Sequence, residues 1–207
     1  MKTRSIARPN TVYSVKLRQG GYALLQTMSD TCRIAVFNEF RNEPDWTGVQ
    51  LSQSNVLFIC SVIRNFFQNS LIEKLSGLAA CRDLEFPNKA ISLDGHRTVT
   101  LTVGKSKHEI VAMGDGLSLC HTKWHDGRPS LSYTNIKRTD FEKVKHLELS
   151  TLRAYPELNE RLSLCRKLGR NVDPMKEIAF DRQLPPQFET YVVIIGGLIP
   201  SKQFGYL

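Results

Sequence analysis

Apolar and polar positions alternate with a short period in the N-terminal part of the chain. Three apolar runs lie at 12–17, 22–25 and 34–37, and Gly20-Gly21 separates the first two. Short alternating runs joined by glycine turns are typical of antiparallel hairpins. The chain is therefore expected to begin with a β-meander rather than with the strand, loop and helix of a nucleotide-binding fold.

The next apolar run leaves two interpretations open. Residues 56–63 are nearly all apolar, and periodicity does not separate a buried strand from a buried helix in such a run. The β-branched residues of the run favour a central strand. The alternative is a helix that continues through Leu75 and ends at Gly77.

The middle of the chain, at 89–132, predicts a second meander. In the run at 98–103 apolar residues alternate with threonines, so we expect one buried face and one face in water. Glycine next to aspartate favours tight turns between strands. The turns expected here are Asp94-Gly95, Gly114-Asp115-Gly116 and Asp126-Gly127.

The spacing of apolar residues becomes helical in the C-terminal third. A stripe with spacings of three and four follows Pro156 and ends at Gly169, and it consists of Leu158, Leu162, Cys165 and Leu168. Asp173-Pro174 combines a capping residue with a proline suited to the first turn, which predicts a second helix. The β-branched run at 191–195 predicts a last strand.

These patterns together predict an α+β fold, mainly an antiparallel twisted sheet of two meanders, with helices concentrated in the C-terminal third. We expect 1–207 to form a single domain, because no clear linker interrupts it. Within it we expect a basic, flexible N-terminus at 1–10, a β-rich part at 11–135 and a helical part with a final strand at 136–207. With 41% hydrophobic residues, a chain of this length can form a core.

Composition also bears on the compartment. No apolar run is long enough to cross a membrane, and the basic N-terminal residues lack the apolar stretch of a secretory signal. The five cysteines are odd in number, widely spaced and without a C-x-x-C pair, which favours reduced thiols that are mostly buried. The expectation is a cytoplasmic protein with no membrane partner.

Motifs that would specify chemistry are missing from the sequence. It contains neither a phosphate-binding glycine loop nor a nucleophile elbow. Cys120, His121 and His125 lie close together, but neighbouring strand residues point to opposite faces, and zinc needs three or four converging ligands. We therefore expect no catalytic residues, no metal and no cofactor, and a chain that is not an enzyme.

The net charge of +8 favours an anionic partner, either nucleic acid or an acidic protein face. Lys and Arg are scattered, so a solvated basic surface is the alternative. Trp46 and Trp124 fall in polar segments and are candidate partner-binding residues, together with His125 and Arg128. A loop tryptophan can instead fold back onto the core, where it gains buried area.

The region from Thr11 to about Gly77 resembles the immunity-twenty-six family, bacterial proteins that accompany polymorphic toxins and neutralise them. The later segment at 155–168 is similar to the charged helix near the end of those proteins. The matching features of the first region are the alternating strand at 12–17, Gly21-Tyr22-Ala23, the apolar strand at 34–37 and Val56-Leu57-Phe58.

This resemblance implies binding without catalysis, in which the chain covers a toxin's active site or another surface that the toxin needs. Because this chain is basic, we expect the toxin to present an acidic contact face. The competing hypotheses are a nucleic-acid-associated protein, an enzyme of unrecognised type and a structural or regulatory module. A nucleic-acid partner would require a contiguous basic face and binding that weakens steeply with salt.

Overall fold

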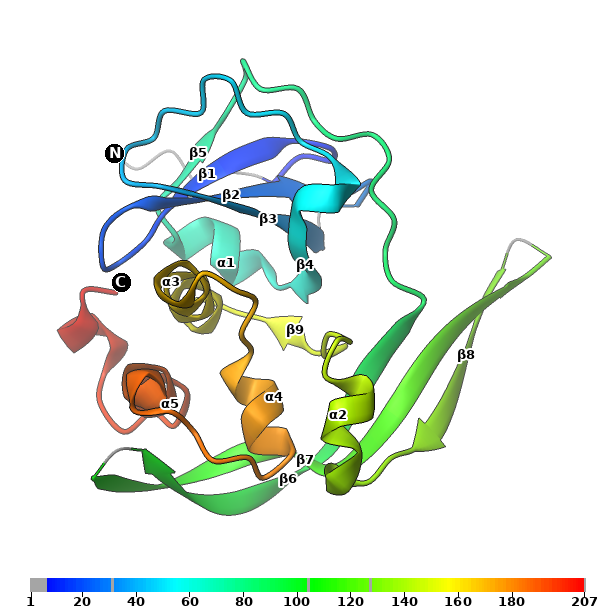
Figure 1. The fold of residues 1–207 in the computed structure, drawn as a ribbon, viewed down its shortest axis with the longest axis vertical. Coiled ribbons are helices and arrows are strands. Elements are labelled where there is room, and N and C mark those ends of the chain that lie inside the picture. The colour runs from blue at the N-terminus through cyan, green and yellow to red at the C-terminus, as the bar shows by residue number, and fades with distance from the viewer. Residues whose placement is uncertain (1–6, 31, 104, 127, 207) are drawn as a thin grey trace. The chain divides into compact units, whose positions relative to one another are not determined.

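The computed structural model describes residues 7–30, 32–103, 105–126 and 128–206, and it has the predicted α+β fold (Figure 1). The chain, expected as one domain, divides into two compact units. Unit 1 comprises Met1–Glu85, Leu152–Val172 and Ile199–Leu207, and unit 2 comprises Phe86–Thr151 and Asp173–Leu198. Each unit is thus assembled from segments that are distant in sequence.

Unit 1 is built on a six-stranded sheet with the order β5-β1-β2-β3-β4-β9, in which only β4 and β9 pair in parallel. The predicted opening meander and the predicted strand at 56–63 are confirmed. The alternative helix is restricted to α1, Arg64–Asn69. The strands are β1 Val12–Lys16, β2 Tyr22–Thr27, β3 Arg33–Arg41, β4 Val56–Val62, β5 Ile72–Lys74 and β9 Leu152–Arg153.

The two faces of this sheet are covered differently. On one face, β-strand residues such as Leu24 and Phe37 pack with apolar side chains from the irregular segments around 46–51 and 75–84. On the other face, the ring of Tyr13 in β1 meets Phe67 of α1 at 5.6 Å between centroids. Strands β1 to β4 each contain consecutive buried residues, which point alternately to the two faces, so the centre of the sheet is buried on both sides.

Helix α3, Glu157–Leu168, confirms the predicted apolar stripe. Leu158, Leu162 and Cys165 are completely buried. Gly169 ends the helix with a left-handed φ of 63°, a conformation that glycine adopts without a steric penalty.

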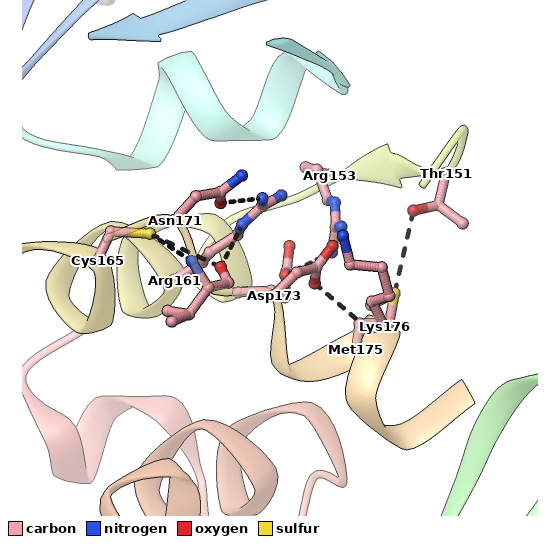
Figure 2. Close-up of polar contacts among 10 residues, drawn as sticks. Thr151, Arg153, Arg161, Cys165, Asn171, Asp173, Met175 and Lys176 are labelled. Carbon is pink, nitrogen blue, oxygen red and sulfur yellow. Dashed lines mark hydrogen bonds and ion pairs between the residues drawn. The ribbon is translucent and has the colours of Figure 1, made fainter. Parts of the chain in front are cut away.

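A buried arginine fastens the chain that follows α3 (Figure 2). The Arg161 side chain has no exposed surface, and its guanidinium lies 3.8 Å from the ring centroid of Phe58 in β4. Its Nε donates to the carbonyl of Val172 at 2.9 Å, and a terminal nitrogen donates to Asn171 Oδ1 at 2.9 Å. A guanidinium can satisfy several acceptors at once in a fixed geometry. Arg161 therefore holds the segment after the helix against the helix itself.

The C-terminal segment of unit 1 contacts α3 through a second polar cluster. Tyr206 donates its hydroxyl to Glu160, which is 2% exposed, and Arg18 Nε donates to the same carboxylate at 2.6 Å. The ring of Tyr206 also packs edge-on against Tyr155 at 5.3 Å. Burial, and next the Glu160 charge, raise the pKa of Tyr206 well above its usual range.

Unit 2 contains a three-stranded antiparallel sheet in the order β6-β7-β8, with β6 Lys89–Val103, β7 Ser106–His125 and β8 Arg128–Asn135. The predicted turn at Asp94-Gly95 is wrong, because β6 runs through it. The register shifts between Asp94 and His96, and Gly95 and Gly114 adopt positive φ. The predicted turn at Gly114-Asp115-Gly116 is wrong as well, because β7 runs through it. Glycine next to aspartate permits a β-bulge as readily as a turn, and the two expected turns lie opposite each other at one irregularity in the pairing of β6 and β7.

Two other predictions for unit 2 are confirmed. Thr98, Thr100 and Thr102 are exposed, whereas Val99 and Val103 are buried. His125 pairs with Arg128, so β7 and β8 are joined at the predicted third hairpin. Gly127 of that turn lies outside the described residues.

Short helices cover the buried face of this sheet. Phe141 and Val144 of α2 and Ala179 of α4 pack with Ile91, Leu93 and Leu117 of the sheet. Asp173 caps α4 by accepting from the backbone N–H of Lys176, as predicted (Figure 2). These helices are α2 Phe141–Val144, α4 Pro174–Ala179 and α5 Glu189–Ile195; the short 3-10 helices of the two units are Gln53–Asn55, Arg138–Asp140, Pro186–Phe188 and Ser201–Phe204.

The predicted final strand at 191–195 is wrong, because these residues form α5. Tyr191, Val192, Val193 and Ile194 are all buried. A short run that is apolar on every side suits a buried helix as well as a buried strand, and β propensity is easily overridden by packing.

No helix in the part of the chain that the structure describes is long and apolar enough to cross a membrane. The side chains of Cys60, Cys120 and Cys165 are buried, that of Cys81 is half-buried, and that of Cys32 is exposed.

Replacing Arg161 by alanine is expected to lower the free energy of unfolding by about 3 kcal/mol, because it removes buried hydrogen bonds and leaves a cavity over Phe58. Denaturant titration followed by circular dichroism measures this. Arg170→Ala, which changes an exposed arginine nearby, is the matched control and should stay within about 0.5 kcal/mol. Equal effects of the two variants would contradict the role given to Arg161.

Replacing Tyr206 by phenylalanine removes only the hydroxyl that binds Glu160, and it should cost about 1–3 kcal/mol at neutral pH. Because folding raises the pKa of Tyr206, its contribution is complete below about pH 10, the unfolded value, and is lost as pH rises through the folded value. Urea titrations at neutral pH and above pH 10 should therefore show a steeper alkaline loss of stability in the parent chain than in Tyr206→Phe. Parallel losses would contradict this, and Tyr22→Phe is the control.

Candidate functional site

In unit 2, β8 and the part of β7 that pairs with it form a region that we call the β7–β8 arm and define as residues 118–135. Pairing between β6 and β7 is recorded as far as Lys89 opposite His121, whereas β7 and β8 remain paired as far as His125 opposite Arg128. Beyond His121 the arm therefore has two strands instead of three, as the ribbon drawing shows (Figure 1). A ribbon of this kind has little core of its own.

Every residue of β8 is exposed. Leu131 and Tyr133 are the large apolar residues among them, with 56% and 57% of their surface in contact with solvent. They lie two positions apart and therefore share one face, on which they lie opposite Thr122 and Cys120 of β7. Neighbouring exposed apolar side chains on a regular element are typical of surfaces that bind another molecule.

The hydroxyl group of Tyr133 can form hydrogen bonds with a partner without carrying a charge. Like an ordinary tyrosine, its hydroxyl is protonated at neutral pH, and electrostatic interaction with Cys120 raises its pKa further. A tyrosine in this state offers a donor, an acceptor and a flat apolar ring with few rotatable bonds. Tyrosine is accordingly enriched among the residues that dominate binding energy.

The charge of the arm is predominantly basic. Lys123 and Arg128 are exposed near its tip, and Asp126 is the acidic residue of this stretch. Lys89, opposite His121 at the last pair with β6, is exposed as well. The arm thus combines a small apolar face with cationic side chains.

The residues proposed from sequence as partner contacts separate into two groups. Trp124, His125 and Arg128 all fall at the tip of the arm, where Trp124 pairs with Pro129 and His125 with Arg128. Arg128 is exposed, and the side chains of Trp124 and His125 lie outside the described part of the structure.

Trp46 lies elsewhere and is 7% exposed. It packs into the apolar cluster of unit 1, with the guanidinium of Arg41 5.9 Å from its ring. The structure therefore confirms the alternative for Trp46, a loop tryptophan that folds back onto the core. Burial of this large side chain explains the placement, and Trp46 is not available as an exposed anchor.

Sequence reasoning missed Leu131 and Tyr133. Their alternation after the Asp126-Gly127 turn was a sign of a strand, but the same pattern would fit a half-buried strand. They are exposed because β8 contributes no residue to the apolar core cluster of unit 2, so that cluster does not cover them.

A surface pocket in unit 1 is a weaker candidate for a functional site than the arm. An open pocket of about 580 Å³ contains Arg41 and Arg166 together with Glu43 and Asp45, so its charges offset one another. Arg166 is already occupied, since it donates to the carbonyl of Gly20 and to Asn42 Oδ1. Within the described residues no group of three or more His, Cys, Asp or Glu is placed to hold a metal ion.

Comparison with known proteins places the chain in a family. A family model described as "Domain of unknown function (DUF8309)" matches residues 2–183. The chain belongs to the DUF8309 family. In this family member the match includes the whole β7–β8 arm and ends before α5. No curated protein and no solved structure matches the chain.

The arm should tolerate polar substitution without loss of stability. Leu131→Thr and Tyr133→Thr are each expected to change the free energy of unfolding by no more than about 0.5 kcal/mol, because both side chains are exposed. Leu117→Thr, in the same sheet but 5% exposed and packed against α2 and α4, should cost about 2–4 kcal/mol. Denaturant titration measures all three, and a large loss for either arm variant would contradict an exposed arm.

Proposed function

We propose that this chain is a non-catalytic immunity protein of the bacterial cytoplasm, which binds a cognate toxin and covers its active site or a surface that it needs. We assign the contact to the β7–β8 arm. The observation that supports this most directly is that all of β8 is exposed and presents Leu131 and Tyr133 on one face. The resemblance of the first region to the immunity-twenty-six family suggests the class of partner.

Binding by the arm is favoured because its backbone is already ordered, so little conformational entropy is lost when a partner binds. Leu131 and Tyr133 project from a hydrogen-bonded strand, so their backbone is already fixed before a partner arrives. Binding then has to immobilise only side chains, which leaves more of the contact energy as affinity. A pair of neighbouring apolar anchors surrounded by polar residues matches the usual anatomy of a protein interface.

Charge suggests the nature of the contacted face. Lys123 and Arg128 lie between the apolar pair and the tip of the arm, and the chain as a whole carries +8. A basic contact surface attracts an acidic one over distance and raises the rate of association. We therefore propose an acidic contact face on the toxin, which excludes inhibition by imitation of a phosphate backbone.

A nucleic-acid partner is the second candidate, because a basic two-stranded ribbon has the dimensions to enter a major groove. Lys123 and Arg128 would then contact phosphates, and binding would fall steeply with salt. The two candidates predict different effects of changing Leu131 and Tyr133. The apolar surface of these residues would contribute to binding a protein, whereas phosphate contacts would be made by Lys123 and Arg128. An experiment that varies salt, nuclease and these two residues therefore separates them.

The test is co-purification from the native host at low and at high salt after nuclease treatment, with the parent chain and a Leu131→Thr/Tyr133→Thr double variant. One stoichiometric protein should remain with the parent at both salt concentrations, and its recovery should fall at least about tenfold with the double variant. Val111→Thr is the matched control, because Val111 is 68% exposed in the same sheet but outside the arm. It should retain the partner.

The recovered protein is then expressed in a bacterial host, where it should arrest growth unless this chain is co-expressed. A recovered protein without toxicity, or nucleic acid recovered alone and lost at high salt, would contradict the immunity function. Retention of a toxic partner by the double variant would leave that function and overturn its assignment to the arm.

A further inference from the structure

The β7–β8 arm has a free backbone edge whose orientation is fixed by the hydrogen bonds around it. The N–H of Ile136 donates to the carbonyl of Leu117 at 3.0 Å, and the N–H of Thr122 donates to the carbonyl of Asn88 at 2.8 Å. In an antiparallel ladder, successive residues of one strand turn their N–H and C=O groups to alternate sides. Together with the register of β7 and β8, these two bonds determine which residues of β8 face outward.

Even-numbered residues of β8 bond to β7. Ser130 and Ser132 are the register partners of Lys123 and His121. They lie an even number of positions from Ile136, so their N–H and C=O groups point to β7 as the N–H of Ile136 does. The N–H and C=O groups of Leu131 and Tyr133 point the other way, to the side on which the sheet has no further strand among the described residues. The same two residues thus present both apolar side chains and unused backbone groups.

Pro129 agrees with this assignment. It lies at an outward-facing position, where its missing N–H removes no bond to β7. Proline on an edge strand limits the number of donors that another strand could use. The remaining outward donors of β8 are the N–H groups of Leu131, Tyr133 and Asn135, away from the tip of the arm.

A strand added to this edge would gain backbone bonds and side-chain contacts together. Its side chains would lie beside Leu131 and Tyr133 on one face and beside Ser130, Ser132 and Thr134 on the other, and all five are exposed. Addition of an extended segment to a sheet edge is a general mode of recognition, in which the backbone supplies affinity and alternate side chains supply specificity.

Charge determines which segment fits. Lys123 and Arg128 lie at the tip, and Lys89 lies on β6, on the other side of β7 from β8. The acidic residues near them are Asp126 in the arm and Asp94 in β6, whose charge acts on Tyr133. An acidic segment would be attracted to this end of the sheet, whereas a basic segment would be repelled. A second copy of this chain, which also carries +8, is disfavoured for the same reason.

We propose that the open edge of β8 binds an extended acidic polypeptide segment, which joins the three-stranded sheet of unit 2 as a fourth strand through the backbone groups of Leu131 and Tyr133. This inference rests on the proposed function, because it assigns that segment to the toxin. It goes further by naming the backbone edge, rather than side chains alone, as the recognised feature.

The first test uses synthetic peptides and the intact parent chain. The probe is a blocked peptide of about ten residues, a usual upper length for a strand, in which Glu and Val alternate. One control replaces every Glu by Lys, and another carries N-methyl groups on the backbone amides of both edges. Nuclear magnetic resonance follows amide exchange at each residue of β8, and a fluorescent label reports affinity.

The acidic peptide should bind at least about tenfold more tightly than either control, a difference of about 1.4 kcal/mol. Amide exchange at Leu131 and Tyr133 should slow on binding, whereas Ser130 and Ser132 should be protected already without peptide. Absence of binding at about 1 mM, equal binding of the N-methylated peptide, or protection confined to other residues would each overturn the proposal.

The second test compares two substitutions at one position. Leu131→Ala shortens the side chain and keeps the outward N–H, whereas Leu131→Pro also removes that N–H without touching a bond to β7. Strand addition predicts that Leu131→Pro abolishes peptide binding and that Leu131→Ala weakens it less. Equal weakening would overturn strand addition. Circular dichroism checks folding, and if Leu131→Pro does not fold, the N-methylated peptide tests the same bonds with the parent chain.

The failure of this inference differs from the failure of the proposed function. A toxin that is neutralised and retained equally by the parent chain and by Leu131→Pro would overturn strand addition and leave the immunity function. Tight binding of the acidic peptide at Leu131 and Tyr133, together with the absence of any toxic partner, would leave the edge as a binding site and overturn its assignment to a toxin.

Discussion

The antiparallel ladder of unit 2 satisfies the backbone of β8 on one side only, and the properties of the arm follow from this constraint. A strand at the edge of a sheet keeps a row of unpaired N–H and C=O groups, which natural proteins usually shorten, cover or interrupt. Here the edge is eight residues long, contains one proline and is exposed throughout. On the face of the same strand, Leu131 and Tyr133 remain exposed because they lie outside the apolar core cluster of unit 2.

Unit 1, by contrast, contains polar side chains that are buried and hydrogen-bonded. Arg161 and Glu160 lie on α3 and are almost completely buried, yet each is hydrogen-bonded to groups that the chain brings from elsewhere. Burial of a charge is costly unless partners compensate for it, so these contacts restrict how the segments around α3 can pack. Unit 1 is thereby specified by buried polar contacts, whereas the arm of unit 2 leaves its polar backbone groups on one edge for water or for a partner.

The β-bulge near Gly95 and Gly114 connects the two halves of the long ribbon in unit 2. Without a turn at these glycines, β6 and β7 continue past the irregularity. The side on which β7 goes on to pair with β8 is also the side whose Ile91, Leu93 and Leu117 pack with α2 and α4. A bulge adds twist and redirects a strand without ending it. Both sides of the irregularity carry buried residues, Ile91 and Leu93 on one side and Val99 and Val103 on the other, so the packed strands β6 and β7 support the exposed strand β8.

The sequence by itself determined the elements whose signals are local. Alternation with glycine turns predicted the opening meander, the apolar stripe before Gly169 predicted α3, and Asp173-Pro174 predicted the start of α4, because each signal depends on neighbouring residues alone. It also led to three residues at the tip of the arm, Trp124, His125 and Arg128. The tertiary structure alone decided that Asp94-Gly95 is a bulge, that 191–195 is a helix, that Trp46 is buried, and that Leu131 and Tyr133 are exposed. In each of these cases the local pattern fits two environments equally well, and the choice depends on which distant segment, if any, packs against it.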